Sequence, residues 1–242
     1  EFSKNRLKDF ENRVEFNNGN FQNVISKFET YNIKGILADI GVSSLQLDKL
    51  ERGFSFNSLT LDMRMDQNQI LDAAIVVNNY SQTDLEKILR EYGEVREYKK
   101  IASLIVSNRP FYSSKDLAEF LYKKMPKGKI HPATLVFQAI RIEVNDELGV
   151  LERLFDSIEK AKFKNCIVAI ISFHSLEDRI VKNYFKKWSQ NCICPEGAFR
   201  CECGNNHALG KIITKKPIIP TQNEIKQNPR SRSSKLRIFK FD

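Results

Sequence analysis

The sequence lacks any segment long and apolar enough to cross a membrane. None of its 242 residues lies in a run of roughly 18 consecutive apolar residues, the length a transmembrane helix needs. The first residues also lack the apolar region of a signal peptide. Internal repeats and low-complexity segments are absent as well, which argues against repeat architectures and disordered linkers. We therefore expect a cytoplasmic globular protein without a membrane partner, whose 41% of hydrophobic residues suffice for a buried core.

Acidic residues are scarce toward the carboxyl end of the chain. Residues 211–242 carry nine Lys or Arg against two acids, whereas residues 1–210 have a net charge of only +2. A positive charge gathered in one segment favours contact with a polyanion at that place, and a nucleic acid is the usual case. A solvated basic terminus without a partner is the alternative.

Apolar runs and helical periodicity predict an α/β protein interrupted by helices. The segments expected to be strands are 14–16, 35–39 and 166–173. The segments expected to be helical are 4–10, 21–28, 133–161 and 176–188, and hydroxyls at Ser81 and Ser113 predict two further helix starts. We divide the chain into a first α/β part (1–67), an all-helical insertion (68–130) and a second α/β part (131–242). The last part includes a Cys-rich loop (190–204) and a basic tail (211–242).

The densest group of polar and aromatic residues follows the predicted strand 35–39. Asp39 ends this apolar run, and Gly41 and Ser43 come directly after it. The carboxyl ends of parallel strands are where open α/β sheets bind ligands. The following residues, up to 66, show neither helical nor strand periodicity, and long loops of this kind in compact domains are usually functional or disordered. Because this one is too apolar for disorder, we expect a ligand site here.

Cysteine occurs at only five positions, and four of them are clustered. Cys192 with Cys194 and Cys201 with Cys203 form two Cys-x-Cys pairs that are six residues apart. Four thiolates at this density suit a tetrahedral zinc site, and disulfides are rare in the cytoplasm. Since Cys-x-Cys is a less usual chelate than Cys-x-x-Cys, a plain loop is the alternative. Cys166 lies in an apolar run, and we expect it to be a small buried hydrophobe.

Seven segments, in order along essentially the whole chain, together resemble one known family. They are 39–46 (DIGVSSLQ), 52–56 (RGFSF), 61–66 (LDMRMD), 92–94 (YGE), 137–148 (FQAIRIEVNDEL), 171–182 (ISFHSLEDRIVK) and 228–237 (NPRSRSSKLR). The family is the ribosomal RNA small subunit methyltransferase H family, also called MraW. The resemblance implies a Rossmann-like methyltransferase that uses S-adenosylmethionine to modify the N4 atom of a cytidine in the decoding region of 16S ribosomal RNA. Naked RNA or the small ribosomal subunit is its substrate. The competing hypothesis is a non-catalytic RNA-binding module that docks on the small subunit.

The same resemblance implies roles for individual residues. The expected cofactor contacts are Phe21, Asp39 and Gln46. The amine of cytosine is a weak nucleophile, so it needs orientation and hydrogen-bond acceptors for its two hydrogens. The candidate acceptors are Asp39, Ser43, Asp66, Glu143, Asn145 and His174, among which the sequence does not choose. We expect the helical insertion to face the RNA and aromatic rings to shape a pocket for the unstacked base. The expected RNA contacts are Phe54 and Phe56 at the base, and Arg230, Arg232, Lys235 and Arg237 at phosphates.

One feature of the family is missing from this sequence. Members begin with a strand and a Gly-rich loop, and a second strand follows that ends in an acid holding the cofactor ribose. The ten glycines of this chain contain no G-x-G turn, which would let backbone amides approach the cofactor. We therefore expect an N-terminally incomplete enzyme that is inactive by itself, and a natural non-catalytic relative is the alternative.

Overall fold

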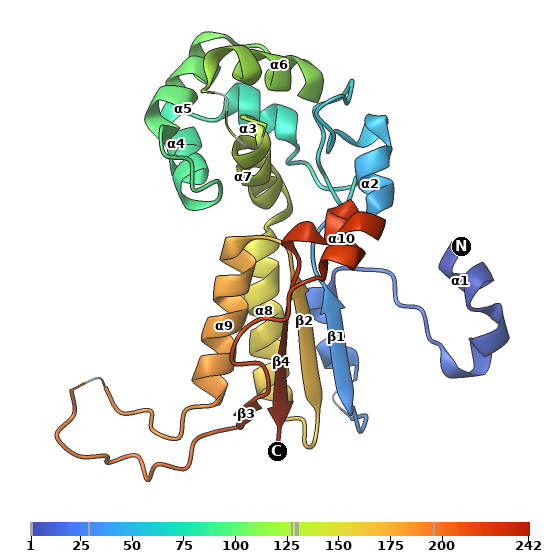
Figure 1. The fold of residues 1–242 in the computed structure, drawn as a ribbon, viewed down its shortest axis with the longest axis vertical. Helices are drawn as coiled ribbons and strands as arrows, with labels where there is room; N and C mark the ends of the chain where they lie inside the picture. The colour runs from blue at the N-terminus through green and yellow to red at the C-terminus, as the bar shows by residue number, and fades with distance from the viewer. Residues whose placement is uncertain (1, 29, 127, 129–130, 196) are drawn as a thin grey trace. The chain divides into compact units, whose positions relative to one another are not determined.

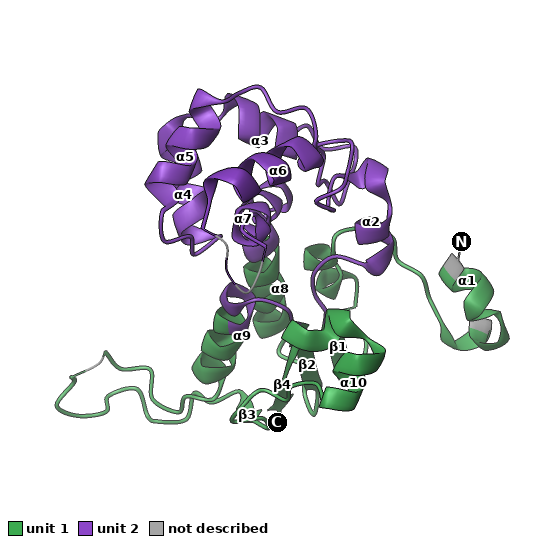
Figure 2. Ribbon diagram, turned by 45° about the horizontal axis from the view of Figure 1, so that its top comes forward, with its two compact units in different colours: residues 1–38, 150–171, 179–242 green, residues 39–149, 172–178 purple. Residues whose placement is uncertain are grey.

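A computed structural model describes residues 2–28, 30–126, 128, 131–195 and 197–242. The chain forms two compact units, shown in Figure 2. The first, which we call the sheet unit, comprises residues 1–38, 150–171 and 179–242, and the second, the helical unit, comprises residues 39–149 and 172–178. The predicted insertion, 68–130, lies wholly within the helical unit, which extends further along the chain on both sides of it.

The sheet unit is built on a four-stranded sheet with the order β1-β2-β4-β3 (Figure 1). The strands are β1 (Gly35–Asp39), β2 (Ile167–Ser172), β3 (Gly210–Ile212) and β4 (Lys235–Phe241). β3 pairs antiparallel with β4, and Figure 1 shows β1 and β4 running in opposite directions. The strands predicted at 35–39 and 166–173 are confirmed, and so is the α/β fold class. The last seven-residue strand was not predicted, because its three basic residues hide its apolar alternation.

Two helices and an aromatic cluster complete the sheet unit. The helices are α8 (Glu147–Ala161), which belongs to the sheet unit from Val150 onward, and α9 (Ser175–Trp188), which belongs to it from Arg179 onward. The ring of Trp188 lies 5.6 Å from that of Phe155 on α8 and 5.0 Å from that of Phe241 on β4, centroid to centroid. All three rings are almost completely buried. Since aromatic side chains bury large apolar areas, this cluster fixes the last strand of the chain to both helices.

The helical unit is built from α-helices of five to twelve residues. They are α2 (Ser44–Asp48), α3 (Ala73–Asn79), α4 (Gln82–Glu91), α5 (Tyr98–Ser107), α6 (Ser114–Lys124) and α7 (Thr134–Asn145). Leu89 of α4, Ile105 of α5 and Leu117 of α6 are fully buried in one hydrophobic core. The hydroxyls of Ser81 and Ser113 accept hydrogen bonds from the third residue of α4 and α6, so both predicted starts are confirmed.

Several predicted elements differ from the structure. Residues 14–16 form no strand, and 21–28 fold into two short 3-10 helices, η2 (Phe21–Asn23) and η3 (Ile25–Lys27). Residues 4–10 are divided between α1 (Phe2–Arg6) and the 3-10 helix η1 (Lys8–Arg13). The single helix predicted over 133–161 is wrong, because Asp146 adopts a left-handed conformation, φ 48°, that ends α7 before α8 begins.

The predicted basic tail is folded into regular elements. Residues 211–242 contain part of β3, the helix α10 (Gln222–Gln227), the 3-10 helix η5 (Pro229–Ser233) and β4, an inner strand of the sheet. A further 3-10 helix, η4 (Leu50–Arg52), lies in the helical unit. None of the helices in the described chain is long and apolar enough to cross a membrane.

Candidate active site

Asp39 stands at the carboxyl end of β1, where the chain turns into the loop that the sequence singled out. Its carboxyl group is exposed, although desolvation by the neighbouring chain raises its pKa. Gly41 follows with φ +118°, and a Cβ atom there would lie 3.3 Å from Cδ2 of Phe173. The loops that leave β1 and β2 therefore meet at a glycine whose conformation other residues rarely adopt. This is the edge at which open α/β sheets bind ligands.

Ser43 and Gln46 form a capping box at the start of α2. The backbone N–H of Ser43 donates to Oε1 of Gln46 at 2.8 Å, and the backbone N–H of Gln46 donates to Oγ of Ser43 at 3.2 Å. These two bonds satisfy donors that the first turn of a helix leaves without partners. The two bonds therefore fix the positions of the Ser43 hydroxyl and the Gln46 carboxamide, which follow Asp39 closely in the sequence.

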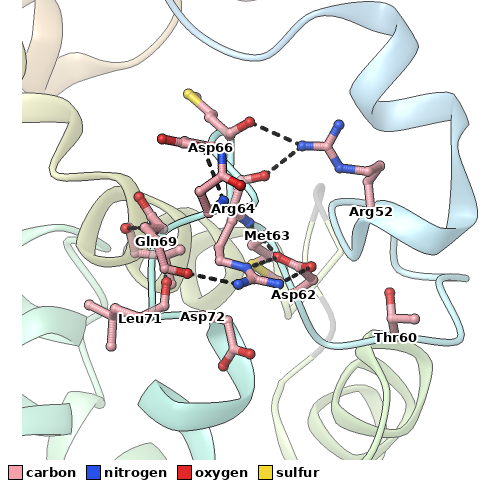
Figure 3. A network of polar contacts seen from close by, with 12 residues as sticks. Arg52, Thr60, Asp62, Met63, Arg64, Asp66, Gln69, Leu71 and Asp72 are labelled. Carbon is pink, nitrogen blue, oxygen red and sulfur yellow. Dashed lines mark hydrogen bonds and ion pairs between the residues drawn. The ribbon is translucent and has the colours of Figure 1, made fainter. Parts of the chain in front are cut away.

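The segment 61–72 is held in place by two arginines, as Figure 3 shows. Nε and Nη2 of Arg64 donate to the two carboxylate oxygens of Asp62 at 2.8 and 3.0 Å, and Nη1 donates to the carbonyl of Gln69 at 2.7 Å. Arg52 donates to the carbonyls of Arg64 and Met65 at 2.7 and 3.2 Å. Burial opposes ionisation of Asp62, but the hydrogen bonds and the charge of Arg64 outweigh it, and the pKa of Asp62 is lowered.

Asn145, at the end of α7, fastens this segment to the helix. Its Nδ2 donates to the carbonyl of Met63 at 2.8 Å and to that of Arg141 at 2.9 Å, and its Oδ1 accepts from the N–H of Met65 at 2.6 Å. Both amide hydrogens are therefore engaged with backbone. Met63 adopts a left-handed conformation, φ 58°, which is uncommon for a residue with a side chain. Asn145 supports that conformation from both sides.

Two further candidate acceptors have different surroundings. Glu143 accepts a hydrogen bond of 2.7 Å from the hydroxyl of Tyr80, and both line a hollow of about 290 Å³. Burial and this bond raise the pKa of Tyr80. Asp66 is exposed, and its Oδ1 accepts from the backbone and the side chain of Asn68, both at 3.0 Å. Asp66 thus keeps a solvent-facing carboxylate in a local turn.

His174 belongs to a buried network of polar side chains at the start of α9. Its Nε2 lies 3.1 Å from Oε1 of Glu177, and the side chains are only 8% and 3% exposed. Oε2 of Glu177 accepts from the backbone N–H groups of Phe173 and His174. Arg141 makes a two-point contact with Glu147 at 2.7 and 3.0 Å. One carboxylate oxygen each of Glu147 and Glu177 and a ring nitrogen of His174 all lie within 4.8 Å of one another. Arg141 supplies positive charge beside these carboxylates.

The two phenylalanines expected at the RNA base have different environments. Phe54 is 8% exposed and lies in the hydrophobic core of the helical unit. Phe56 is half-buried and stacks on His131 at 4.5 Å between centroids, and His131 stacks on Tyr122 at 5.4 Å. These three rings line a hollow of about 280 Å³ together with Lys115 and Lys123. Of the pair, only Phe56 borders this hollow.

The remaining predicted site residues lie in the sheet unit. Phe21, in η2, is 37% exposed and is preceded by Asn20, which caps η2. Arg230 and Arg232, in η5, are exposed, Lys235 is half-buried, and Arg237 is 8% exposed. Burial on an inner strand leaves Arg237 little surface for a phosphate.

The structure also brings the four clustered cysteines together. Their Sγ atoms all lie within 4.8 Å of one another. The backbone N–H groups of Ile193 and Asn205 lower the pKa of Cys203, whereas hydrogen bonds with the neighbouring thiols raise the pKa of Cys192. Cys166 is buried, as predicted, and burial raises the pKa of its thiol.

Some residues of the site were not predicted. Arg141 and Glu147 stand within a largely apolar helical stretch, and a charged residue in such a stretch is a signal for a buried ion pair. Tyr122 and His131 give no comparable signal, because they lie outside the seven segments of the resemblance and meet Phe56 only through the fold.

Comparison with known proteins gives consistent results over the whole chain. The model of the MraW methylase family matches residues 1–242. A protein of Aliarcobacter butzleri named Ribosomal RNA small subunit methyltransferase H is 81% identical over 241 residues, which cover 100% of this chain and 80% of that protein. Proteins of the same name from Sulfurimonas denitrificans and Nitratiruptor sp. are 59% and 56% identical, and the matches cover 100% and 99% of this chain and 80% of each relative.

Proposed function

Because the chain belongs to the MraW methylase family, we propose that it carries the site of an enzyme that methylates the N4 atom of a cytidine in the decoding region of 16S ribosomal RNA. The observation that supports the proposal is the match to the family over all 242 residues, together with the 81% identity to a relative whose name states that it is a methyltransferase of small-subunit ribosomal RNA. The substrate is 16S ribosomal RNA or the small ribosomal subunit that contains it.

S-adenosylmethionine, when bound, supplies a methyl group activated by its sulfonium. Phe21, Asp39 and Gln46 are the residues proposed to hold it. Their chemistry fits the ligand, because an adenosyl group needs an apolar face and hydrogen-bonding partners, and a carboxylate is favourable near a positive sulfur. Phe21 is partly exposed, Asp39 has an exposed carboxyl, and Gln46 is ordered by the capping box.

The acceptor for the cytosine amine is proposed to be one of Asp39, Ser43 and Asp66. All three residues are exposed, so a substrate can reach their polar atoms. Asn145 and His174 are less suited to the role, since the Asn145 amide donates to the carbonyl of Met63 and Nδ1 of His174 accepts from the backbone N–H of Glu177. An ionised carboxylate accepts hydrogen bonds from both amine hydrogens and orients the lone pair toward the methyl group.

For the RNA, we propose that the hollow lined by Phe56, His131 and Tyr122 receives an unstacked base. Stacking on aromatic rings recognises single-stranded bases. Lys115 and Lys123, two exposed residues that line the hollow together with one acid, Glu119, would meet the neighbouring phosphates. Arg230 and Arg232 are proposed as further phosphate contacts.

The test is mass analysis of the decoding-region cytidine in cells whose copy of the gene is deleted. We expect the N4-methyl group to disappear in these cells and to return when the full-length gene is restored. A gene with Asp39→Asn should restore it poorly, whereas Asp9→Asn, which alters an exposed acid of η1, should restore it fully. A cytidine that stays methylated without the gene would favour the non-catalytic RNA-binding module.

A further inference from the structure

None of the described residues of the loop 190–209, between α9 and β3, is a buried hydrophobic residue. Its described residues form no helix or strand, and in Figure 1 it extends far from the strands of the sheet unit. Its large apolar side chains are exposed, Ile193 to 62% and Phe199 completely. The base of the loop is closed by hydrogen bonds from Leu209 to Trp188 and from His207 to Asn191. Between these two hydrogen bonds, packing of buried apolar side chains does not hold the loop in its conformation.

The Sγ atoms of the four clustered cysteines lie close together in this loop. The Sγ atom of Cys201 lies 3.6 Å from that of Cys192 and 3.5 Å from that of Cys203, and the Cys192 and Cys203 sulfurs are 3.8 Å apart. A tetrahedral zinc site with Zn–S bonds of about 2.3 Å has sulfur–sulfur edges of about 3.8 Å. A disulfide would instead bring two sulfurs to about 2.05 Å. The observed spacing is that of a metal tetrahedron.

Backbone amides also favour thiolates at this place. The N–H of Ile193 donates to Sγ of Cys203 at 3.4 Å, and the N–H of Glu202 donates to Sγ of Cys194 at 3.3 Å. Each bond runs from one Cys-x-Cys pair to the other, so the two pairs hold each other in register. Hydrogen bonds to ligand sulfurs orient them and stabilise their negative charge, as in the surroundings of known metal sites.

We propose that Cys192, Cys194, Cys201 and Cys203 bind one zinc ion that ties the two halves of the 190–209 loop together. The four thiols lose their protons to solvent on binding, and the ion compensates part of the resulting negative charge. Because all four positions of the tetrahedron are taken by cysteine, no position is left for a water or a substrate, which is the pattern of a structural site. This site is independent of the proposed methyl transfer.

The test is elemental analysis of the full chain, purified under reducing conditions without added metal. We expect about one zinc per chain in the wild type and less than about 0.1 in the double variant Cys201→Ser, Cys203→Ser. Cys166→Ala is the matched control, since Cys166 is buried in the sheet unit, and it should retain one zinc. A wild type with less than about 0.1 zinc and four freely titrating thiols would overturn the proposal. Full zinc in the double variant, or iron in place of zinc, would overturn it too.

A second measurement does not depend on how well the variant folds. Arg200 lies in the loop between the two cysteine pairs and is exposed, so trypsin can report on the order of the loop. In the wild type, a zinc chelator should speed cleavage after Arg200 several-fold, and added zinc should reverse the effect. Cleavage that is indifferent to chelator and zinc would contradict a zinc-tied loop.

Discussion

Gly53, in the helical unit, has little room for a side chain, and its replacement gives a direct test of the loop geometry. Its φ is +76°, and a Cβ atom there would lie 2.5 Å from the backbone nitrogen of Asp62. Gly53→Ala should therefore lower the free energy of unfolding by at least about 1 to 3 kcal/mol, since a strained backbone and a clash with main chain act together. Thermal unfolding measures the decrease. Gly128→Ala is the control, because no described atom beyond the neighbouring residues lies within 4 Å of the added carbon, and it should leave the midpoint nearly unchanged.

Asp62 links the stability of the same loop to pH. Arg64 lowers its folded-state pKa, so folding favours the ionised carboxylate. The stabilisation is fully present above the unfolded-state pKa of about 3.9 and is lost as the pH falls through the folded-state value. Asp62→Asn should cost about 1 to 3 kcal/mol at pH 7, because Arg64 loses its charged partner, and the difference from wild type should shrink below about pH 4.

Urea unfolding at several pH values measures this dependence. Glu119→Gln is the control, because its ion pair with Lys115 spans 4.0 Å and both side chains are more than half exposed. Such surface pairs contribute little. A constant difference between wild type and Asp62→Asn from pH 7 to about pH 3.5 would show that the carboxylate charge is not what holds Arg64.

At the scale of elements, η5 is the part of the basic carboxyl-terminal segment best suited to meet RNA. The exposed Arg230 and Arg232 lie on it. The double variant Arg230→Ala, Arg232→Ala should weaken RNA binding and reduce the slope of log affinity against log salt. The expected reduction is about 0.9 for each duplex phosphate that the variant no longer binds, and about 0.7 for each single-stranded phosphate.

Filter binding over a range of salt concentrations measures the slope. Lys160→Ala with Lys164→Ala removes the same charge from exposed positions elsewhere in the sheet unit, and it should leave the slope unchanged. Equal slopes for the wild type and the η5 variant would mean that η5 does not touch the phosphates.

For the whole molecule, we expect the 242-residue chain to bind S-adenosylmethionine weakly. It has no G-x-G turn whose amides could approach the cofactor. Loss of a few hydrogen bonds, at about 1 to 3 kcal/mol for each partner left unpaired, takes a micromolar affinity to the millimolar range. Strand β1 is also an edge of the sheet, with Leu37 71% exposed, so we expect limited solubility. Calorimetric titration measures the affinity, and a dissociation constant in the low micromolar range would contradict the prediction.

Several elements could be predicted because their signals are local. The strands 35–39 and 166–173 are apolar runs of strand length, and Ser81 and Ser113 start helices through a bond to a residue three positions away. The break at Asp146 was not predictable in this way, because apolar spacing continues across it and only a left-handed backbone angle separates α7 from α8. Strand β4 was missed for a different reason, since three basic residues interrupt its apolar alternation.

By itself, the sequence determined the family, the α/β class, the position of the loop after Asp39 and the set of four cysteines, because each depends on residue types at fixed spacing. The tertiary structure decided which of those residues are accessible. Phe54 is in a core while Phe56 borders a hollow, and Arg237 is buried while Arg230 is exposed, although each pair is close in sequence. The reason is physical: burial and hydrogen bonding depend on neighbours brought together by folding, and Asn145 meets Met63 across 82 residues of chain.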